Sequence, residues 1–388
     1  MRDQFLQKAN EVKKELSKLV VDMYHDPEIA DQEFKACQWH IDILRKHGFE
    51  IEEKFSGVET GYRAIYDSKK KGKTVAYMAE YDALPGIGHG CGHNILGATS
   101  LGAAIVLKNF MDEIGGKVIV FGTPAEETSG AKVIYAENGE FDDLDFAMMA
   151  HPASAYMKSG TSLALEPVEF EFFGKPSHAA SEPEKGINAL DAALITMTSI
   201  NALREHIRPD SRVHGIVVKG GEAANVVPEY TKLQYYVRST TKTYNQELLE
   251  KVKNCARAGA LATGCELKIS KYEFSYDNLI TNQVLSDVFD EAILEIANIK
   301  MDEPKKSTGS LDMGQVSQFC PTIHPYFDIT NDRSVAGHTR ELADATITPF
   351  ALDSMVVTSA SLALTAYKVM SDDNLFDKMK QEFLKAEK

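Results

Sequence analysis

The sequence has few cysteines and few basic residues, and no segment repeats. Its five cysteines are odd in number and irregularly spaced along 388 residues, which argues against a disulfide framework and favours reduced thiols. Lysine and arginine total 42 against 57 acidic residues, a net charge of −15, which argues against nucleic acid or an anionic membrane as a partner. No apolar run is judged long enough to span a bilayer. The N-terminus has no secretion-signal pattern, so we expect a cytoplasmic protein.

The length of the chain exceeds one ordinary hydrophobic core, so two domains are expected. Strand and helix patterns alternate before about residue 167, and helical patterns return after about residue 277. The first domain is therefore predicted to be discontinuous, over residues 1–167 and 277–388. Its alternating elements predict an α/β fold of phosphorylase/hydrolase-like type, with a mostly parallel sheet flanked by helices.

Three buried strands of this domain are each followed by side chains that can carry chemistry. The strands are predicted at 73–78, 117–121 and 145–150, and the side chains are Asp82, Glu126-Glu127 and His151. Ligands of open parallel sheets bind outside the carboxyl ends of the strands. We therefore expect these residues to meet at one site. Helices are predicted at 3–23, from Asp26-Pro27 to about Lys46, at 94–111 and at 348–370.

Residues 168–276 have a different pattern and form a predicted insert. Strands and helices follow in the order β-α-β-β-α-β, which is the ferredoxin-like arrangement. Such a sheet leaves an exposed edge that invites pairing with another chain. We therefore predict a lid that also joins the chain into a homodimer or a larger homo-oligomer.

The segment His89-Gly-Cys91-Gly-His93 is the most informative stretch of the chain. Cysteine and histidine are the usual ligands of zinc, and thiolate favours zinc over magnesium or calcium. Glycine lets the backbone fold tightly enough for both side chains to reach one centre. A haem attachment motif is excluded because only one cysteine is present. A phosphate-binding loop is excluded because no Gly-Lys-Ser/Thr follows.

The pair Glu126-Glu127 follows a buried strand and a proline, unlike Glu52-Glu53, which fits a solvated charge run. Adjacent side chains point opposite ways, so one carboxylate can ligate a metal while the other faces the substrate. A carboxylate beside metal-activated water is what hydrolysis needs. As an alternative, Cys91 could be a nucleophile with His89 or His93 as its base, but that leaves Glu127 and His151 unexplained.

The remaining histidines fall into two groups. His25, His40 and His206 fit ordinary surface or core positions. His151, His324 and His338 each lie beside proline or glycine in loop-like segments and are candidates for the site. His178 follows an insert strand and is a weaker candidate for a substrate contact.

Together these motifs resemble the cocatalytic zinc amidohydrolases and peptidases, which include aminoacylases, hippurate and auxin-conjugate hydrolases and p-aminobenzoyl-glutamate hydrolase. The resemblance looks closest to the p-aminobenzoyl-glutamate hydrolase and dipeptidase-like branch. It runs along nearly the whole chain and rests on His25-Asp-Pro-Glu-Ile29, Tyr81-Asp-Ala-Leu-Pro85, His89-Gly-Cys-Gly-His93, Pro124-Ala-Glu-Glu127, His151-Pro152, Ser177-His-Ala-Ala180, Gly186-Ile-Asn-Ala189, Asn225-Val-Val-Pro228, Gly309-Ser-Leu-Asp-Met-Gly314, Pro321-Thr-Ile-His-Pro325 and Gly337-His-Thr339.

The resemblance implies two divalent cations, zinc or alternatively manganese. Cys91 takes the bridging position that an aspartate fills in many relatives. The other implied ligands are His93, Glu127, His151 and His338. Glu126 is the implied general base, and Asp82 would hold a ligand in place. His324 is the rival of His338 as the last ligand; otherwise it would contact the substrate.

On the insert, the resemblance places His214 and Asn225 where relatives bind the substrate carboxylate or oxyanion, sometimes across a dimer. Arg238 ends a predicted strand, where its guanidinium could bind a carboxylate in bidentate fashion or could simply be solvated. The chain departs from the pattern in two places. Asn94 stands where this branch often has aspartate, and Glu80 stands where other metallo-exopeptidases have a histidine ligand.

The implied activity is hydrolysis of an amide bond in a small N-acyl amino acid, dipeptide or aroyl-glutamate. One alternative is a non-catalytic metal- or peptide-binding protein on the same scaffold. Another is an aminopeptidase-type preference for a free amino end.

Overall fold

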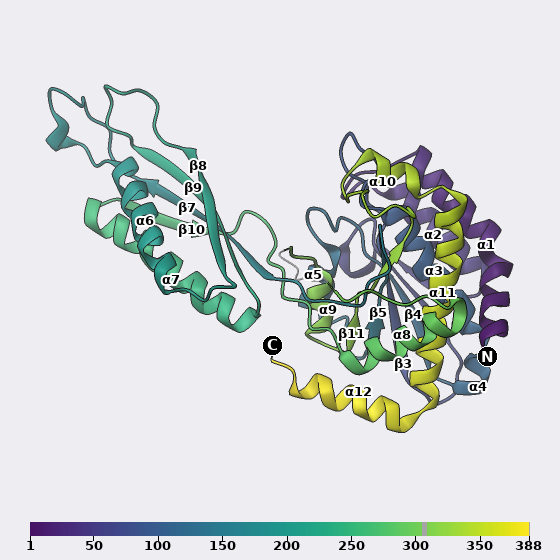
Figure 1. Cartoon of the computed structure of the whole chain (residues 1–388). Helices are drawn as coiled ribbons and strands as arrows, with labels where there is room; N and C mark the ends of the chain where they lie inside the picture. The colour runs from purple at the N-terminus through teal and green to yellow at the C-terminus, as the bar shows by residue number, and fades with distance from the viewer. Residues whose placement is uncertain (305–308, 388) are drawn as a thin grey trace. The chain divides into compact units, whose positions relative to one another are not determined.

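The computed structural model describes residues 1–304 and 309–387, and it divides the described chain into two compact units (Figure 1). The first unit holds residues 1–161, 279–304 and 312–387. The second holds residues 162–278 and 309–311. Each unit has its own cluster of buried apolar side chains.

The first unit contains a six-stranded sheet in the order β1-β2-β4-β3-β5-β11. Strands β4, β3, β5 and β11 run parallel, and β1 and β2 form an antiparallel edge. The prediction of a mostly parallel sheet is confirmed. A separate parallel pair joins β6 to β12. The strands are β1 (Glu50–Glu53), β2 (Tyr62–Asp67), β3 (Thr74–Ala79), β4 (Lys117–Gly122), β5 (Phe146–Met148), β6 (His151–Ala153), β11 (Thr322–Ile323) and β12 (Tyr326–Asp328).

Helix α3 (His93–Lys108) packs on β3 and β4 and is covered in turn by α1 (Arg2–His25) and α11 (Pro349–Ser371) (Figure 1). Small residues permit these close contacts, since a Cβ added at Gly102 would lie 2.5 Å from Ser359 Oγ. The other helices of this unit are α2 (Phe34–Lys46), α4 (Met111–Ile114), α5 (Ala131–Glu137), α8 (Gln283–Ala297), α9 (Met313–Ser317), α10 (Arg340–Ala345) and α12 (Asp373–Lys385).

Two expectations for these helices need correction. Helix α2 begins at Phe34 and not directly after Asp26-Pro27, because the Glu28 carbonyl accepts the Ala83 N–H at 2.8 Å and Ile29 forms a β-bridge with Ala83. Helix α11 is long and apolar enough to span a bilayer by length and composition alone. Most of it is buried against α1, α3 and α8, as in the core helix of a soluble protein.

The second unit is an antiparallel sheet in the order β10-β7-β9-β8 with two helices packed on β7 and β9 (Figure 1). This confirms the ferredoxin-like order. Its elements are β7 (Ala164–Phe173), α6 (Ala189–Leu203), β8 (Arg212–Lys219), β9 (Tyr230–Ser239), α7 (Lys242–Thr263) and β10 (Glu266–Ser270).

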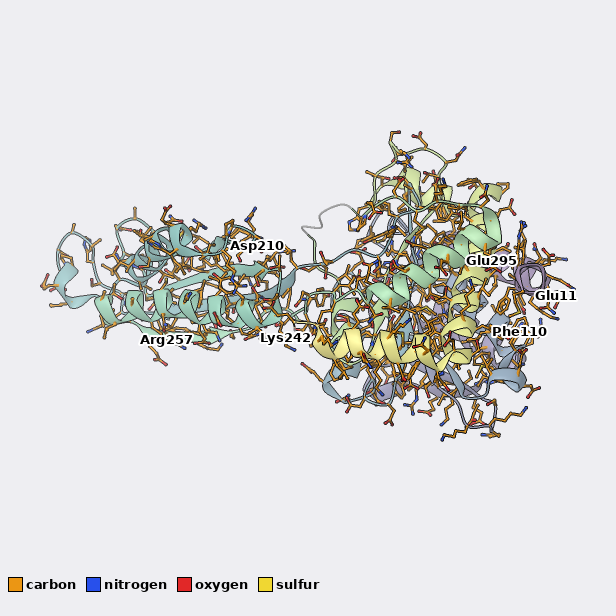
Figure 2. All side chains as sticks on the ribbon, turned by 60° about the horizontal axis from the view of Figure 1, so that its bottom comes forward. Glu11, Phe110, Asp210, Lys242, Arg257 and Glu295 are labelled. Atoms are coloured by element: carbon orange, nitrogen blue, oxygen red, sulfur yellow. The ribbon has the colours of Figure 1, made fainter. Side chains whose placement is uncertain are left out.

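Figure 2 draws the side chains of both units, with Phe110 of the first unit among those labelled. Along β9 buried residues alternate with partly exposed ones, so Leu233, Tyr235 and Val237 join the core that α6 and α7 cover. In the first unit, Phe5 of α1 stacks on Phe110 with ring centroids 4.1 Å apart. The alternation in β9 leaves the other face of that sheet lined by polar and aromatic side chains.

Candidate active site

The site residues of the first unit follow the carboxyl ends of parallel strands. Asp82 follows β3, the pair Glu126-Glu127 follows β4, and His151 follows β5. Cys91 lies in the loop that leads into α3, and His93 is the first residue of that helix. Because these strands are neighbours in the sheet, segments far apart in sequence deliver their side chains to one place.

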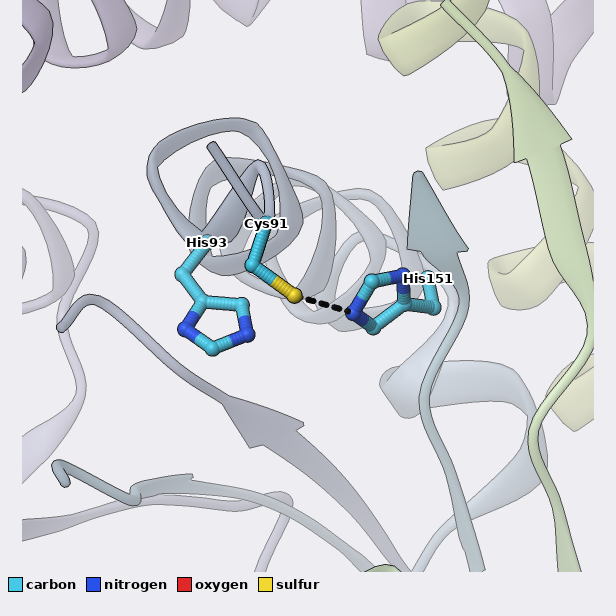
Figure 3. A group of neighbouring side chains, drawn as sticks. All are labelled: Cys91, His93 and His151. Carbon is cyan, nitrogen blue, oxygen red and sulfur yellow. Dashed lines mark hydrogen bonds between the residues drawn. The ribbon is translucent and has the colours of Figure 1, made fainter. Parts of the chain in front are cut away.

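Cys91 lies at the centre of this cluster. Its Sγ is 3.4 Å from Nε2 of His151, and Figure 3 shows the thiol between the rings of His93 and His151. The ligand atoms of Cys91, His93 and His151 all lie within 4.8 Å of one another. The same spacing holds for Cys91, Glu127 and His338, and for His93, Glu126 and Glu127. Cys91 is thus common to two groups that could each hold a cation.

His93 is oriented by two carboxylates. Its Nδ1 lies 2.8 Å from Oδ1 of Asp82, and its Nε2 lies 3.2 Å from Oε2 of Glu80. Within the part of the chain that the structure describes, neither His93 Nε2 nor Glu80 Oε2 has a hydrogen-bond partner, although both are buried. The second oxygen of Asp82 accepts the N–H of Glu127 at 3.1 Å. Asp82 therefore links His93 to the turn that carries Glu126 and Glu127.

Several atoms of the cluster that could bind a metal have no hydrogen-bond partner in the described ranges 1–304 and 309–387. Oε1 of Glu127 is buried without a hydrogen bond, although Nε2 of His338 lies 3.2 Å away. Nδ1 of His151 contacts the Pro152 carbonyl at 2.8 Å, so an N–H there leaves the Nε2 lone pair facing Cys91. Buried polar atoms are normally hydrogen-bonded. This donor set of thiol, imidazole and carboxylate is the set that fits zinc.

A buried ion network adjoins the cluster. Lys132 Nζ lies 2.6 Å from Oε1 of Glu80 and 2.6 Å from Oδ1 of Asp312, and all three side chains are buried. The sequence patterns gave Lys132 and Asp312 no role. Asp312 lies within the Gly309–Gly314 motif, which could have drawn attention to it. Lys132 lies in no such motif, and its partner Asp312 is 180 positions away.

Burial shifts the pKa values of the site groups. It raises the pKa of Glu126 well above its usual range, and the charges of Glu80 and Asp312 raise it further. It raises the pKa of the Cys91 thiol to about 12 and lowers that of His151 to about 3. A buried thiol of this kind is a weak nucleophile, which weighs against Cys91 attacking a substrate. A cation would have to displace the thiol proton on binding.

The two rival histidines occupy different positions. His338 is exposed, has a left-handed φ of 60° and donates its backbone N–H to the Gly90 carbonyl at 2.9 Å. His324 is buried, with its ring centroid 5.5 Å from that of His151 and Nδ1 unpartnered. Among the described residues, His338 belongs to a ligand group and His324 to none.

The remaining candidates for substrate binding belong to the second unit. Nδ1 of the exposed His178 accepts the N–H of Ala180 at 3.2 Å, and the Asn225 carbonyl accepts the N–H of Ala179 at 3.0 Å. These two candidates therefore lie on neighbouring segments.

His214 and Arg238 both lie beside Tyr236. His214 is opposite Tyr236 in the β8–β9 register. The guanidinium of Arg238 lies 5.5 Å from the Tyr236 ring centroid. It donates to Ser310 Oγ at 3.1 Å, and its buried Nε has no hydrogen-bond partner among the described residues.

Residues 167–263 match a family described as the peptidase dimerisation domain. The chain is 34% identical to the Xaa-Arg dipeptidase of Mus musculus, covering 97% of this chain and 90% of that protein. It is 30% identical to one of the subunits of the p-aminobenzoyl-glutamate hydrolase of Escherichia coli, covering 70% of this chain and 60% of that one.

A solved structure shares the fold. A dinuclear metal-binding peptidase of the M20 family from Bacillus subtilis aligns with a TM-score of 0.71 at 20% identity, covering 92% of this chain and 99% of that one. At this identity the likeness concerns the fold alone.

Proposed function

The chain belongs to the M20 family of peptidases and amidohydrolases, which makes it an amide-bond hydrolase, and from this premise we propose that it cleaves small dipeptides or N-acyl amino acids at two divalent cations. The observation that carries the proposal is the position of Cys91, whose thiol belongs to two groups of mutually close ligand atoms. His93 and His151 would complete one cation site. Glu127 and His338 would complete the other.

The charges around the site support a requirement for cations. Glu80 and Asp312 both pair with the ammonium group of Lys132, while Asp82 pairs with His93 and Glu127 lies 3.2 Å from His338. Buried carboxylates need compensating positive charge. When bound, divalent cations polarise the scissile carbonyl and make water a better nucleophile at neutral pH.

The protein groups then have separate tasks. Glu126 would take the proton of the attacking water and pass it to the leaving amine. Asp82 would hold His93 and the Glu127 turn in place, as its two hydrogen-bonded oxygens indicate. Electrostatic stabilisation of the developing oxyanion should supply much of the rate.

We propose that the second unit recognises a free carboxylate on the substrate through Arg238, Asn225 and His214, with His178 as a further candidate. The buried, unpartnered Nε of Arg238 is a donor suited to a carboxylate. The mouse relative is named for dipeptides that end in arginine and the bacterial one for an aroyl-glutamate, and both of these substrates would offer such a group.

We further propose a homodimer that forms through β8. This edge strand exposes Ile216, Val217 and Val218 to 62%, 44% and 45%. An apolar, unpaired edge favours pairing with a second copy. A cytoplasmic location, where thiols stay reduced, also remains our proposal.

The proposal is tested by titrating the metal-free protein with zinc or manganese. Calorimetry should show two cations per chain, and hydrolysis of Xaa-Arg dipeptides, N-acetyl amino acids or p-aminobenzoyl-glutamate should appear only with cation. Iodoacetamide should not label Cys91 while a cation is bound, and after chelation it should label Cys91 only slowly, because burial raises the pKa of the thiol to about 12.

Several results would count against the proposal. Full turnover in chelator would contradict it. Rapid labelling of cation-loaded Cys91 with loss of activity would restore the nucleophile alternative. Peptide binding without turnover in the loaded protein would favour a non-catalytic binding protein.

A further inference from the structure

The turn before Glu126 has an unusual backbone. Ala125 has a φ of 60° and is 1% exposed. Within the described ranges 1–304 and 309–387 it is the one buried residue other than glycine with a positive φ. A residue with a Cβ is strained in this conformation, which persists only where the surroundings hold it. This strained residue lies one position before the proposed catalytic base, so neighbouring groups must stabilise its backbone conformation.

Glu33 is the side chain that holds it. Its Oε1 accepts the backbone N–H of Ala125 at 2.9 Å, and its Oε2 accepts the hydroxyl of Thr60 at 3.1 Å. Glu33 is 0% exposed and occupies the N-cap position of α2. On the other side of the turn, the N–H of Glu127 donates to Asp82. The N–H groups on either side of Glu126 are thus each bound by a buried carboxylate.

The segment that carries Glu33 touches a second loop of the site. The carbonyl of Glu28 accepts the N–H of Ala83, next to Asp82, at 2.8 Å. Residues 28–33 therefore brace the loops after β3 and β4 at once. This contact also explains why α2 starts only at Phe34.

We propose that Glu33 is a positioning residue for the reaction: through the Ala125 N–H it holds the turn that aims Glu126 at the water and Glu127 at the cation. The inference rests on the proposed function, in which Glu126 is the base. Misplacing a reacting group by about 1 Å can cost roughly 100-fold in rate. Loss of the Glu33 contact should therefore lower kcat and leave substrate affinity intact.

The experiment compares Glu33→Ala with Glu33→Gln. Burial raises the pKa of Glu33 to about 7, so a neutral amide is a close mimic that still offers an oxygen to Ala125. Glu33→Ala should lose about 10- to 100-fold in kcat at unchanged KM and cation content, and Glu33→Gln should recover most of the rate. Glu382→Ala is the matched control. That carboxylate accepts the N–H groups of Gln283 and Val284 at the start of α8, and its loss should leave kcat unchanged.

Further variants keep the test decisive. If Glu33→Ala does not fold, Glu33→Asp replaces it, because a carboxylate on a side chain one methylene shorter keeps the acidic group but no longer reaches the Ala125 N–H. The expected result is a kcat lowered about 3- to 10-fold at wild-type thermal stability and cation content. A wild-type kcat in whichever of these two variants is used would overturn the positioning role, as would a change confined to stability.

Glu126→Gln, measured in parallel, distinguishes failure of the general-base assignment from failure of the positioning role of Glu33. If it loses rate while Glu33→Ala, or Glu33→Asp in its place, does not, the base assignment stands and the positioning role fails. If Glu126→Gln keeps the wild-type rate, the base assignment fails, and the role of Glu33 fails with it.

Discussion

The two units differ in how their buried carboxylates are neutralised. In the second unit, Glu166 and Glu169 are buried, but each reaches a lysine at the surface, at 3.0 Å for Lys271 and 2.6 Å for Lys232. In the first unit, the buried carboxylates of Glu80 and Asp312 share one lysine, each at 2.6 Å from Nζ of Lys132. The pairs of the second unit balance one charge with another, whereas the cluster of the first unit holds excess negative charge.

This difference distinguishes charged groups that stabilise the fold from charged groups that serve the reaction. A buried carboxylate paired with one lysine is satisfied and needs no further ligand. Buried carboxylates, imidazoles and a thiol with shifted pKa values and unpartnered atoms mark a functional site. The first unit thus holds the proposed chemistry, and the second presents surfaces suited to recognition and association.

The largest expected effect compares glutamates of the two units. Glu126→Gln should retain cations and lose about 10²- to 10⁴-fold in kcat, the usual range for a general base. Glu127→Gln should lower both kcat and the cation content. Glu166→Gln in the second unit should leave kcat unchanged. Steady-state kinetics and metal analysis of the three variants check this, and equal cation loss from Glu126→Gln and Glu127→Gln would contradict the assigned roles.

A smaller effect is expected from the recognition surface. Arg238→Ala and Asn225→Ala should each raise the activation free energy that corresponds to kcat/KM for a free-acid substrate by on the order of 2–4 kcal/mol, because the contact would strengthen in the transition state. The C-terminal amide of the same substrate should be a poor substrate that neither change affects. If the amide is cleaved as well as the acid, carboxylate recognition is wrong and an aminopeptidase-type preference becomes the better interpretation.

A substitution in the edge strand β8 tests whether the dimer forms through the second unit. Val217→Lys should place like charges opposite each other across a twofold interface and weaken the dimer by roughly 100-fold, about 2.7 kcal/mol. Light scattering over a dilution series measures this. Leu261→Lys is the control, since Leu261 is 87% exposed on α7 and lies off the edge. A Val217→Lys chain that associates like the wild type would remove β8 from the interface.

The smallest effect concerns a buried histidine outside the proposed ligand set. Burial lowers the pKa of His40 to about 3, and its Nδ1 pairs with Tyr62 Oη at 3.0 Å. Between about pH 6.5 and 3, His40 is protonated in the unfolded chain but neutral in the folded protein. The free energy of unfolding therefore falls as the pH drops below 6.5, and His40 has no effect on it above that pH.

A variant isolates that contribution. His40→Gln should show a shallower loss of unfolding free energy on acidification, by up to about 1.4 kcal/mol per pH unit. Denaturant unfolding of both metal-free proteins at pH 7, 6 and 5 measures the difference. Identical slopes for the two proteins would show that His40 takes up its proton in the folded state.

Short motifs predicted residues that the structure brings close together. Cys91 and His93 lie two positions apart, Glu126-Glu127 and His151 directly follow apolar strands, and the β-α-β-β-α-β order of the insert follows from local periodicity. The two rival last ligands, His324 and His338, could not be separated in this way. Only the fold brings His338 into a ligand group with Cys91 and Glu127. The domain boundaries at residues 167 and 277 and the roles of the site residues stay predictions.

The amino-acid sequence by itself determined which chemical groups this protein possesses and which segments carry them, because spacing and periodicity act within a few residues. The tertiary structure decided what surrounds those groups. Lys132 meets Asp312 across 180 positions, and Glu33 meets Ala125 across 92. Such partners meet only when distant segments pack together. The free energy of a buried charge depends on every charged and polar group around it, so short sequence patterns do not predict these contacts.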